Sequence, residues 1–176
     1  MPAEIVGLGT AVPPYVLTNA DLEQLVDTND QWITERTGIK ERRIAGREDS
    51  TGSLGRQAAE RALAVAGVDA ADVDLLIVAT ASPDHLLPSA SAILQLELGL
   101  SRCAAMDLIA GCAGFVYALS TGSQFVESGA VETALVVGSE TLSRITDYTD
   151  RSTCILFGDG AGAAVLRRGE RGVRPF

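Results

Sequence analysis

Cys112 is the residue whose surroundings point most directly to chemistry. It lies in the run DLIAGCAGF (residues 107–115), between an apolar segment typical of a buried strand and one typical of a buried helix. The free N–H groups and the dipole at a helix N-terminus stabilise a thiolate, which is the nucleophilic form of cysteine. Small neighbours on both sides would let a substrate carbonyl approach the sulfur, and the N–H of Cys112 would help to hold an oxyanion. The pattern favours covalent catalysis; the alternative is a small buried core thiol.

A nucleophilic thiol usually works with a base, and His85 is the one histidine of the chain. It lies in the turn SPDHLLP (residues 82–88), where it could act as a base, although a lone loop histidine is more often a surface residue. Cys103 and Cys154 are interpreted as structural thiols. The three cysteines include no pair with the spacing of a redox or zinc motif, so we expect neither disulfides nor a metal site.

The elements that must position Cys112 follow from alternating apolar patterns. Strands are expected at 5–9, 74–80, 104–109, 134–137 and 163–166, and helices at 54–66, 88–98 and 113–127. We interpret residues 11–50 as an insertion with two short helices, and 158–162 as a Gly-rich turn before the last strand. The alternation predicts an α/β fold with a mixed five-stranded sheet, the last strand antiparallel and helices on both faces.

Composition excludes several classes of protein. The chain has 176 residues, 47% of them apolar and 21% charged, which argues against disorder, collagen and coiled coil. Fourteen basic and 23 acidic residues give a net charge of −9, which disfavours nucleic-acid binding. No apolar run reaches the roughly 18 residues of a membrane span, and the start, MPAE, lacks the basic residues of a secretory signal. A cytoplasmic location without a membrane partner is expected.

Basic residues are nevertheless concentrated in one stretch. Five of the fourteen lie within twelve positions: Arg36, Lys40, Arg42, Arg43 and Arg47. Such a cluster would steer a phosphate-bearing or acidic partner toward an otherwise acidic protein. The alternative is a solvated loop that the interleaved glutamates neutralise.

Residues 29–43 (NDQWITERTGIKERR) resemble the signature of the 3-oxoacyl-acyl-carrier-protein synthase III family. Three further segments agree with that family: its active-site cysteine segment at 107–119, a strand end at 138–140 and a Gly-rich turn at 157–163. The segments 29–43 and 107–119 are long and specific, whereas the Gly-rich turn is weak evidence on its own. The resemblance implies a thiolase-like fold of two similar α/β halves, and residues 1–176 correspond only to the N-terminal half.

The resemblance implies a condensing enzyme. Cys112 would accept an acyl group from acyl-CoA, a substrate rather than a cofactor, and condense it with malonyl-acyl-carrier-protein to start fatty-acid synthesis. The alternatives are a starter-unit acyltransferase or synthase of polyketide metabolism on the same fold, and a non-catalytic half that only binds partners. The family's general-base histidine, which His85 does not match, and its asparagine come from the second half. A complementary C-terminal half is therefore expected.

The resemblance also assigns binding roles. The nucleotide part of coenzyme A would contact Thr28, Trp32, Arg36 and Arg151. The acyl carrier protein would dock on Lys40, Arg42, Arg43 and Arg47. The acyl pocket would be lined by Leu142, Leu156 and Phe157, with Leu87 near the dimer contact. Members of the family are homodimers, and the strand at 104–109 is expected at the twofold contact.

Overall fold

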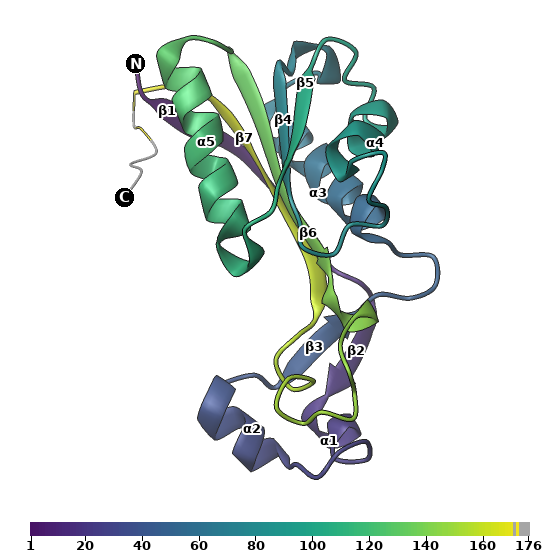
Figure 1. The fold of residues 1–176 in the computed structure, drawn as a ribbon. Coiled ribbons are helices and arrows are strands. Elements are labelled where there is room, and N and C mark those ends of the chain that lie inside the picture. Colours follow the sequence, from purple (N-terminus) through teal and green to yellow (C-terminus); the bar gives the residue numbers. More distant parts are fainter. Residues whose placement is uncertain (171, 173–176) are drawn as a thin grey trace.

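The computed structural model describes residues 1–170 and 172, in a larger and a smaller part (Figure 1). The elements, in chain order, are β1 (Ala3–Ala11), β2 (Tyr15–Thr18), α1 (Asn19–Leu22), α2 (Asp30–Thr37), β3 (Glu41–Ile44), α3 (Thr51–Ala66), β4 (Leu75–Ala79), α4 (Ala90–Glu97), β5 (Ala104–Leu108), α5 (Gly114–Ser128), β6 (Thr133–Thr141) and β7 (Asp159–Arg168). The larger part is a sheet with helices on both sides, and the smaller part lies at one end of the long strands β6 and β7.

The larger part contains a five-stranded sheet in the order β1-β7-β6-β4-β5. Strand β4 runs parallel to both β5 and β6, whereas β7 runs antiparallel to β6 and β1. All five residues of β4 are buried, as expected for a strand that helices cover on both faces. The predicted mixed five-stranded α/β sheet with an antiparallel last strand is confirmed.

Alternate side chains of the central strands feed two separate cores. On one face, Leu76 of β4 and Leu135 of β6 pack with α3 and with Leu94 of α4. On the other face, Ile77 and Val136 pack with α5. The sheet thus holds α3 and α5 in fixed positions on opposite faces.

Helix α3 packs directly against the backbone of β1 at two glycines of that strand. A Cβ atom built on Gly9 would overlap the carbonyl oxygen of Ala58 and lie 2.5 Å from the nitrogen of Ala62. A Cβ on Gly7 would likewise overlap the carbonyl oxygen of Ala62. The absence of side chains at these two positions therefore sets the separation of helix and strand.

Helix α5 also approaches the sheet through small residues, namely Gly114, Ala118 and Gly122. A Cβ on Gly122 would lie 3.1 Å from side-chain atoms of both Leu166 and Val136. The expectation of a mostly buried helix is wrong for its other side, where the exposed fractions are 40% for Val116 and 53% for Tyr117. The reason is that no described element covers that side of α5.

Two strands that were expected to be buried are edges of the sheet. Strand β5 pairs only with β4, and Met106 on it is 37% exposed. Strand β1 pairs only with β7, and Leu8 on it is 59% exposed. Apolar composition therefore overstated burial at both ends of the sheet order.

The Gly-rich segment expected as a turn at 158–162 is mostly strand. Strand β7 begins at Asp159, and Gly160 and Gly162 lie opposite Glu140 and Gly138 of β6. Hydrogen bonding to β6 and β1 on its two sides holds this segment extended despite its glycines.

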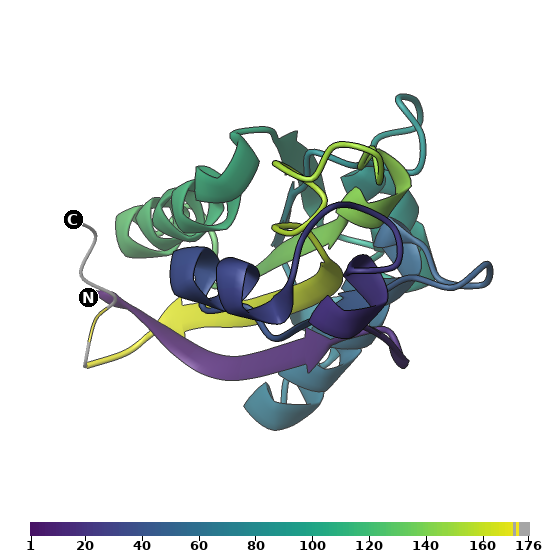
Figure 2. The ribbon, with the colours of Figure 1, turned by 90° about the horizontal axis from the view of Figure 1, so that it is seen from below.

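The smaller part combines the expected short helices with a β2–β3 pair that the sequence analysis missed. Thr18 caps α1, and Asn29 caps α2 through a bond from the N–H of Trp32. Leu22 and Ile33 share a core with Cys154 and Ile155, which the chain adds after β6. Figure 2, seen from below, shows α1 and α2 in front of strands β1 and β7.

Asp159, at the start of β7, fastens the smaller part to the larger one. Its carboxylate accepts hydrogen bonds from the N–H of Ala45 (2.6 Å) and from the N–H and hydroxyl of Ser143 (2.9 and 2.5 Å).

Among the described residues, no helix has both the length and the apolar character to cross a membrane.

Substitution of Gly9 by alanine tests the close packing of α3 on β1. We expect Gly9→Ala to lower the free energy of unfolding by about 2–3 kcal/mol, because the methyl group cannot fit without moving the helix. Gly162→Ala is the control, since its Cβ would have no neighbour nearer than 3.9 Å. Urea denaturation followed by circular dichroism measures both, and equal stabilities for the two variants would contradict the packing argument.

Candidate active site

Cys112 lies in a 3₁₀ turn, Gly111–Ala113, between the end of β5 and the first residue of α5. Gly111 has φ +52°, a left-handed conformation that glycine adopts without strain. The thiol is exposed and not in a disulfide. The structure confirms the predicted position at a strand-to-helix junction; the chemical role of the thiol stays a prediction.

A pocket of about 330 Å³ opens beside Cys112. It forms where β4 and β6 end and β7 begins, against the start of α5. The residues that line it are Ala79, Gly111, Cys112, Phe115, Gly138, Ser139, Glu140, Leu142, Gly160, Ala161 and Gly162. Small and apolar residues dominate, so the pocket suits a small apolar group bound near a nucleophilic sulfur.

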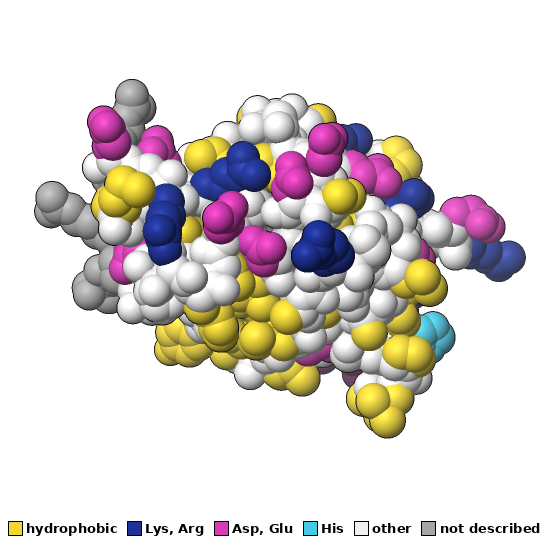
Figure 3. Space-filling view, turned by 90° about the horizontal axis from the view of Figure 1, so that it is seen from above, with side chains coloured by type: hydrophobic (Ala, Val, Ile, Leu, Met, Phe, Trp, Pro, Cys, Tyr) yellow, Lys and Arg dark blue, Asp and Glu magenta, His cyan; other side chains and the backbone are white. Residues whose placement is uncertain are grey.

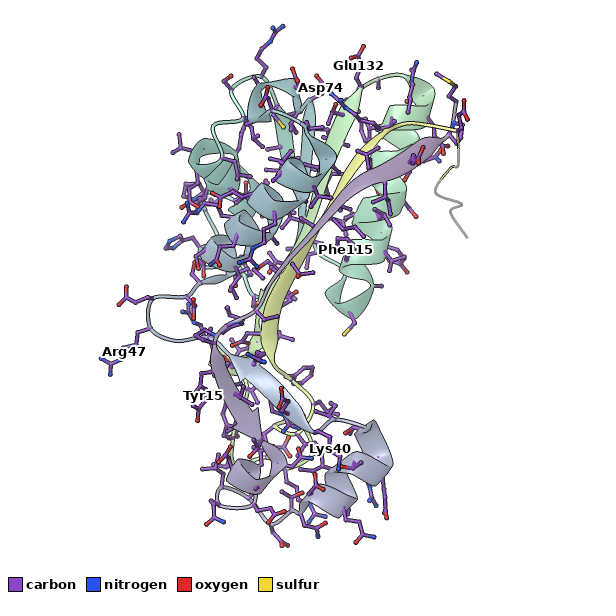
Figure 4. All side chains as sticks on the ribbon, turned by 180° about the vertical axis from the view of Figure 1, so that it is seen from behind. Tyr15, Lys40, Arg47, Asp74, Phe115 and Glu132 are labelled. Atoms are coloured by element: carbon purple, nitrogen blue, oxygen red, sulfur yellow. The ribbon has the colours of Figure 1, made fainter. Side chains whose placement is uncertain are left out.

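Phe115 closes one side of this pocket and was read from the sequence only as a core residue. Figure 4 shows it at the start of α5, beside the sheet. Its ring packs on Gly138, where a Cβ atom would lie 2.9 Å from the ring carbon Cδ2. The glycine in β6 therefore makes room for the aromatic ring, and this pairing over 23 positions leaves no local signal in the sequence.

Glu140 is the one charged residue of the pocket lining. Its carboxylate accepts hydrogen bonds from the N–H of Ala81 (2.7 Å), from the hydroxyl of Thr80 (3.3 Å) and from the hydroxyl of Ser82. The sequence analysis noted residue 140 as part of a strand end but gave it no role.

Of the four expected acyl-pocket residues, Leu142 alone lines this pocket. Leu87 is 86% exposed on the loop that precedes α4, and Leu156 is 44% exposed just before β7. Phe157, next to Leu156, is half-buried but is not part of the lining. These three residues do not line the pocket of the single chain, and their assignment to the acyl pocket stays a prediction.

The expected nucleotide-binding residues gather around Trp32. The guanidinium carbon of Arg36 lies 4.2 Å from the ring centroid, and that of Arg151 lies 4.9 Å from it. Arg151 Nη1 also donates to the carbonyl oxygen of Asp27 (2.8 Å). The hydroxyl of the neighbouring Thr28 is buried and has no hydrogen-bond partner among the described residues. The structure thus brings residues from α2 and from the segment before β7 to one indole ring.

The expected carrier-protein patch is not continuous. Arg42 is only 5% exposed and donates to Asn19 Oδ1 (2.8 Å) and to the carbonyl oxygen of Ile155 (2.7 Å), so its assignment to a surface patch is wrong. Lys40 pairs with Asp30 at 3.0 Å, and Arg43 lies 3.7 Å from Glu41. Figure 4 shows Arg47 on a projecting loop, well away from Lys40.

His85 does not line the Cys112 pocket. It borders a separate polar hollow with Arg47, Asp84 and Arg144, at the start of α3. The structure therefore gives Cys112 no histidine partner among the residues it describes. Within the same residues, no group of three His, Cys, Asp or Glu side chains could hold a metal ion.

The other two cysteines are buried. Burial raises the pKa of Cys103 to about 11, and burial also raises the pKa of the Cys154 thiol. Both thiols pack in hydrophobic cores, Cys103 in the larger part and Cys154 in the smaller part. Their surroundings agree with structural roles.

The chain is similar in sequence to 3-oxoacyl-[acyl-carrier-protein] synthase III proteins. The family model for 3-oxoacyl-[acyl-carrier-protein] synthase III matches residues 106–175. A beta-ketoacyl-[acyl-carrier-protein] synthase III from Thioalkalivibrio sulfidiphilus is 54% identical over 168 residues, which cover 96% of this chain and 52% of that protein. The chain spans about half the length of the curated relatives it matches.

Solved structures give the same result. The 3-oxoacyl-[acyl-carrier-protein] synthase III from Aquifex aeolicus matches with a TM-score of 0.93 and 48% identity, covering 96% of this chain and 54% of that one. The priming β-ketosynthase of the R1128 polyketide pathway matches with a TM-score of 0.94 and 39% identity, covering 97% and 51%.

Alkylation of the folded chain tests the contrast among the three thiols. At pH 8 a thiol with a pKa of about 11 is almost fully protonated, so Cys103 is unreactive while the chain is folded. We expect iodoacetamide to add once, at Cys112, and to add three times in denaturant. Peptide mass spectrometry measures this, with Cys112→Ser as the control that takes no label when folded. Labelling of Cys103 or Cys154 in the folded protein would contradict the assignment.

Proposed function

We propose that this chain, which matches about half of a 3-oxoacyl-[acyl-carrier-protein] synthase III in sequence and fold, carries the acyl-accepting nucleophile of a condensing enzyme. The observation that carries the proposal is the exposed Cys112 in the 3₁₀ turn just before α5, beside an apolar pocket. An acyl group bound there would lie next to the sulfur. The substrate of this step is acyl-CoA.

The acylation step follows from the position of Cys112. The sulfur attacks the thioester carbonyl, and a tetrahedral intermediate forms with the negative charge on oxygen. We assign the stabilisation of that charge to the N–H of Cys112, in the turn just before α5. The bond from carbon to the CoA sulfur then breaks, and the acyl group stays on Cys112. The CoA thiolate that leaves takes up a proton from water, which balances the proton that the Cys112 thiol gave up to water before its sulfur attacked.

The nucleotide end of acyl-CoA is assigned to Trp32, Arg36 and Arg151. An indole offers a flat face to a base, and guanidinium groups bind phosphate in a fork. Both guanidinium groups already lie over the indole ring, so an incoming base would compete with them for it. The buried, unpaired hydroxyl of Thr28 is a further polar group that a ligand could satisfy.

The carrier protein is the second proposed partner. Acyl carrier proteins are acidic, and the exposed Lys40 and Arg47 remain its candidate contacts, together with the half-buried Arg43. Lys40 and Arg43 are already paired with neighbouring carboxylates, so any contribution from them needs those ion pairs to open or to be shared.

Condensation needs partners beyond this chain. The uncovered side of α5, with Val116 and Tyr117, is the surface that we assign to a complementary C-terminal half. The unpaired edge of β5, with Met106 and the 74% exposed Ile109, is assigned to a homodimer contact. Figure 3 shows hydrophobic side chains gathered along one side of the molecule. The general base for condensation would come from the complementary half.

A second candidate function is priming of polyketide synthesis. The match to the priming β-ketosynthase of the R1128 pathway supports it, with a TM-score of 0.94. Both candidates load an acyl group on the cysteine and differ in the later step. The third alternative is a half that binds partners without turnover. The cytoplasmic location stays a prediction.

Acyl loading tests the proposal. We expect incubation with acetyl-CoA to add one acetyl group to the chain, as measured by intact-mass spectrometry under denaturing conditions. Cys112→Ala should take up none. A native spectrum of the same sample should show two copies of the chain if the β5 edge forms the dimer.

The controls decide among the alternatives. An adduct of equal yield on Cys112→Ala would contradict Cys112 as the nucleophile. Absence of any adduct, on a chain that circular dichroism shows to be folded, would favour the non-catalytic half.

The nucleotide site has its own test. Stacking of a base on an aromatic side chain is worth about 1–3 kcal/mol, so Trp32→Ala should raise the acetyl-CoA concentration for half-maximal acylation about tenfold. The limiting rate should stay the same, because Trp32 lies apart from the Cys112 pocket. Tyr15→Ala removes an exposed aromatic from the same smaller part and is the control. An unchanged half-saturation in Trp32→Ala would exclude the site.

A further inference from the structure

Three consecutive residues at the end of β4 are bonded to one carboxylate. Glu140 Oε1 accepts from the N–H of Ala81 at 2.7 Å, and Oε2 accepts from the hydroxyls of Thr80 (3.3 Å) and Ser82. The two carboxylate oxygens therefore accept hydrogen bonds from three donors. An ionised carboxylate accepts through both oxygens, and such charge-assisted bonds are stronger than neutral ones.

A second set of hydrogen bonds extends this attachment to α3. The hydroxyl of Thr51 donates to the carbonyl oxygen of Ser82 at 2.6 Å, so in its 2.7 Å contact with Thr141 it must be the acceptor. The Ser82 hydroxyl, which donates to Glu140, accepts from the N–H of Thr141 at 2.9 Å. Asp84 accepts from the N–H of Thr51 (3.1 Å) and the N–H of Gly52 (2.7 Å).

Buried apolar side chains do not hold the loop that follows segment 80–84. Leu86 is 90% exposed and Leu87 is 86% exposed, so the tip of the loop packs on little of the chain. The position of residues 80–84 thus depends on polar contacts. Among the hydrogen-bond acceptors that bind residues 80–82, Glu140 is the charged one.

The same residues adjoin the Cys112 pocket. Ala79, the neighbour of Thr80, lines the pocket on the β4 side, and Glu140 and Leu142 line it on the β6 side. The added Cβ of Gly114, two residues after Cys112, would lie 3.4 Å from Ala79. Movement of segment 80–82 would therefore displace a wall that the start of α5 touches.

We propose that Glu140 is a positioning residue for acyl transfer: it holds segment 80–82 against the end of β6 and so fixes the wall of the Cys112 pocket. Glu140 acts through Ala79 and Leu142 and takes no covalent part. This inference rests on the proposed function for its kinetic consequence, while its structural consequence can be measured separately.

Three variants test the proposal. Glu140→Gln keeps the shape but leaves one acceptor oxygen for three donors, and its amide N–H₂ would face a donor. Glu140→Asp keeps two acceptor oxygens. Glu132→Gln makes the same chemical change just before the other end of β6, where Figure 4 shows Glu132 far from Phe115, and serves as the matched control.

Two measurements are made on each variant. Hydrogen exchange with mass spectrometry should show segment 80–88 exchanging about tenfold faster in Glu140→Gln than in the wild type, with α2 and β3 unchanged. The limiting rate of Cys112 acylation by acetyl-CoA should fall about tenfold in Glu140→Gln, with half-saturation within twofold of the wild type. Glu140→Asp should recover most of that rate, and Glu132→Gln should match the wild type in both measurements.

The outcomes separate this inference from the proposed function. Unchanged exchange at 80–88 in Glu140→Gln overturns it, and so does faster exchange with unchanged acylation kinetics. If the wild type takes up no acyl group, the proposed function fails by itself. The role of Glu140 in shaping the pocket is then tested by hydrogen exchange together with the rate at which iodoacetamide alkylates Cys112. That alkylation rate must differ at least threefold between Glu140→Gln and the wild type.

Discussion

Close approach of helices to the central sheet through glycine and alanine is the constraint on which the rest of the structure depends. Helix α3 reaches the backbone of β1 at Gly7 and Gly9, and α5 reaches the sheet at Gly114 and Gly122. Without Cβ atoms at these positions, the strands and helices lie near enough for dense packing of the two cores. Gly114 also places the start of α5 next to the end of β4, where a Cβ atom on this glycine would lie 3.4 Å from the Ala79 side chain. It therefore places Cys112 at the ends of the strands rather than out in solvent.

The site is assembled at one end of a sheet, as is common in α/β proteins, where loops after parallel strands carry function. Strands β4 and β6 end there, and the antiparallel β7 starts there with the small residues Gly160 to Gly162. The smaller part, held by Asp159 and by the buried Arg42, brings Trp32 and Arg151 to the same end. The chain thus joins an apolar pocket with a thiol to an aromatic surface with two cations, the two kinds of surface that an acyl-CoA requires.

Features that depend on neighbouring residues could be predicted from the sequence. Features that depend on contacts between residues distant in the sequence could not. Helix ends at Gly67 and Gly129 were predictable, because a glycine with positive φ terminates a helix through its own backbone. The junction at Cys112 was predictable from adjacent apolar runs. Arg42 was misassigned because its burial depends on Ile155, 113 positions away, whose carbonyl oxygen it binds. Phe115 and Glu140 were missed for the same reason, since their contacts cross between strands and helices that only the fold brings together.

In the proposed function, Cys112 accepts an acyl group that a complementary half then uses. The most direct measurement mixes this chain, acetyl-CoA and malonyl-acyl-carrier-protein with the portion of the Thioalkalivibrio sulfidiphilus relative that this chain does not match, and follows the carrier protein by mass spectrometry. In the proposed condensation, decarboxylation of the malonyl group would give CO₂ and a carbanion that would attack the thioester on Cys112 and release the cysteine thiolate. We expect a 3-oxoacyl-carrier-protein only when both halves are present and Cys112 is intact. The same product from Cys112→Ala, or from this chain without the second half, would contradict it.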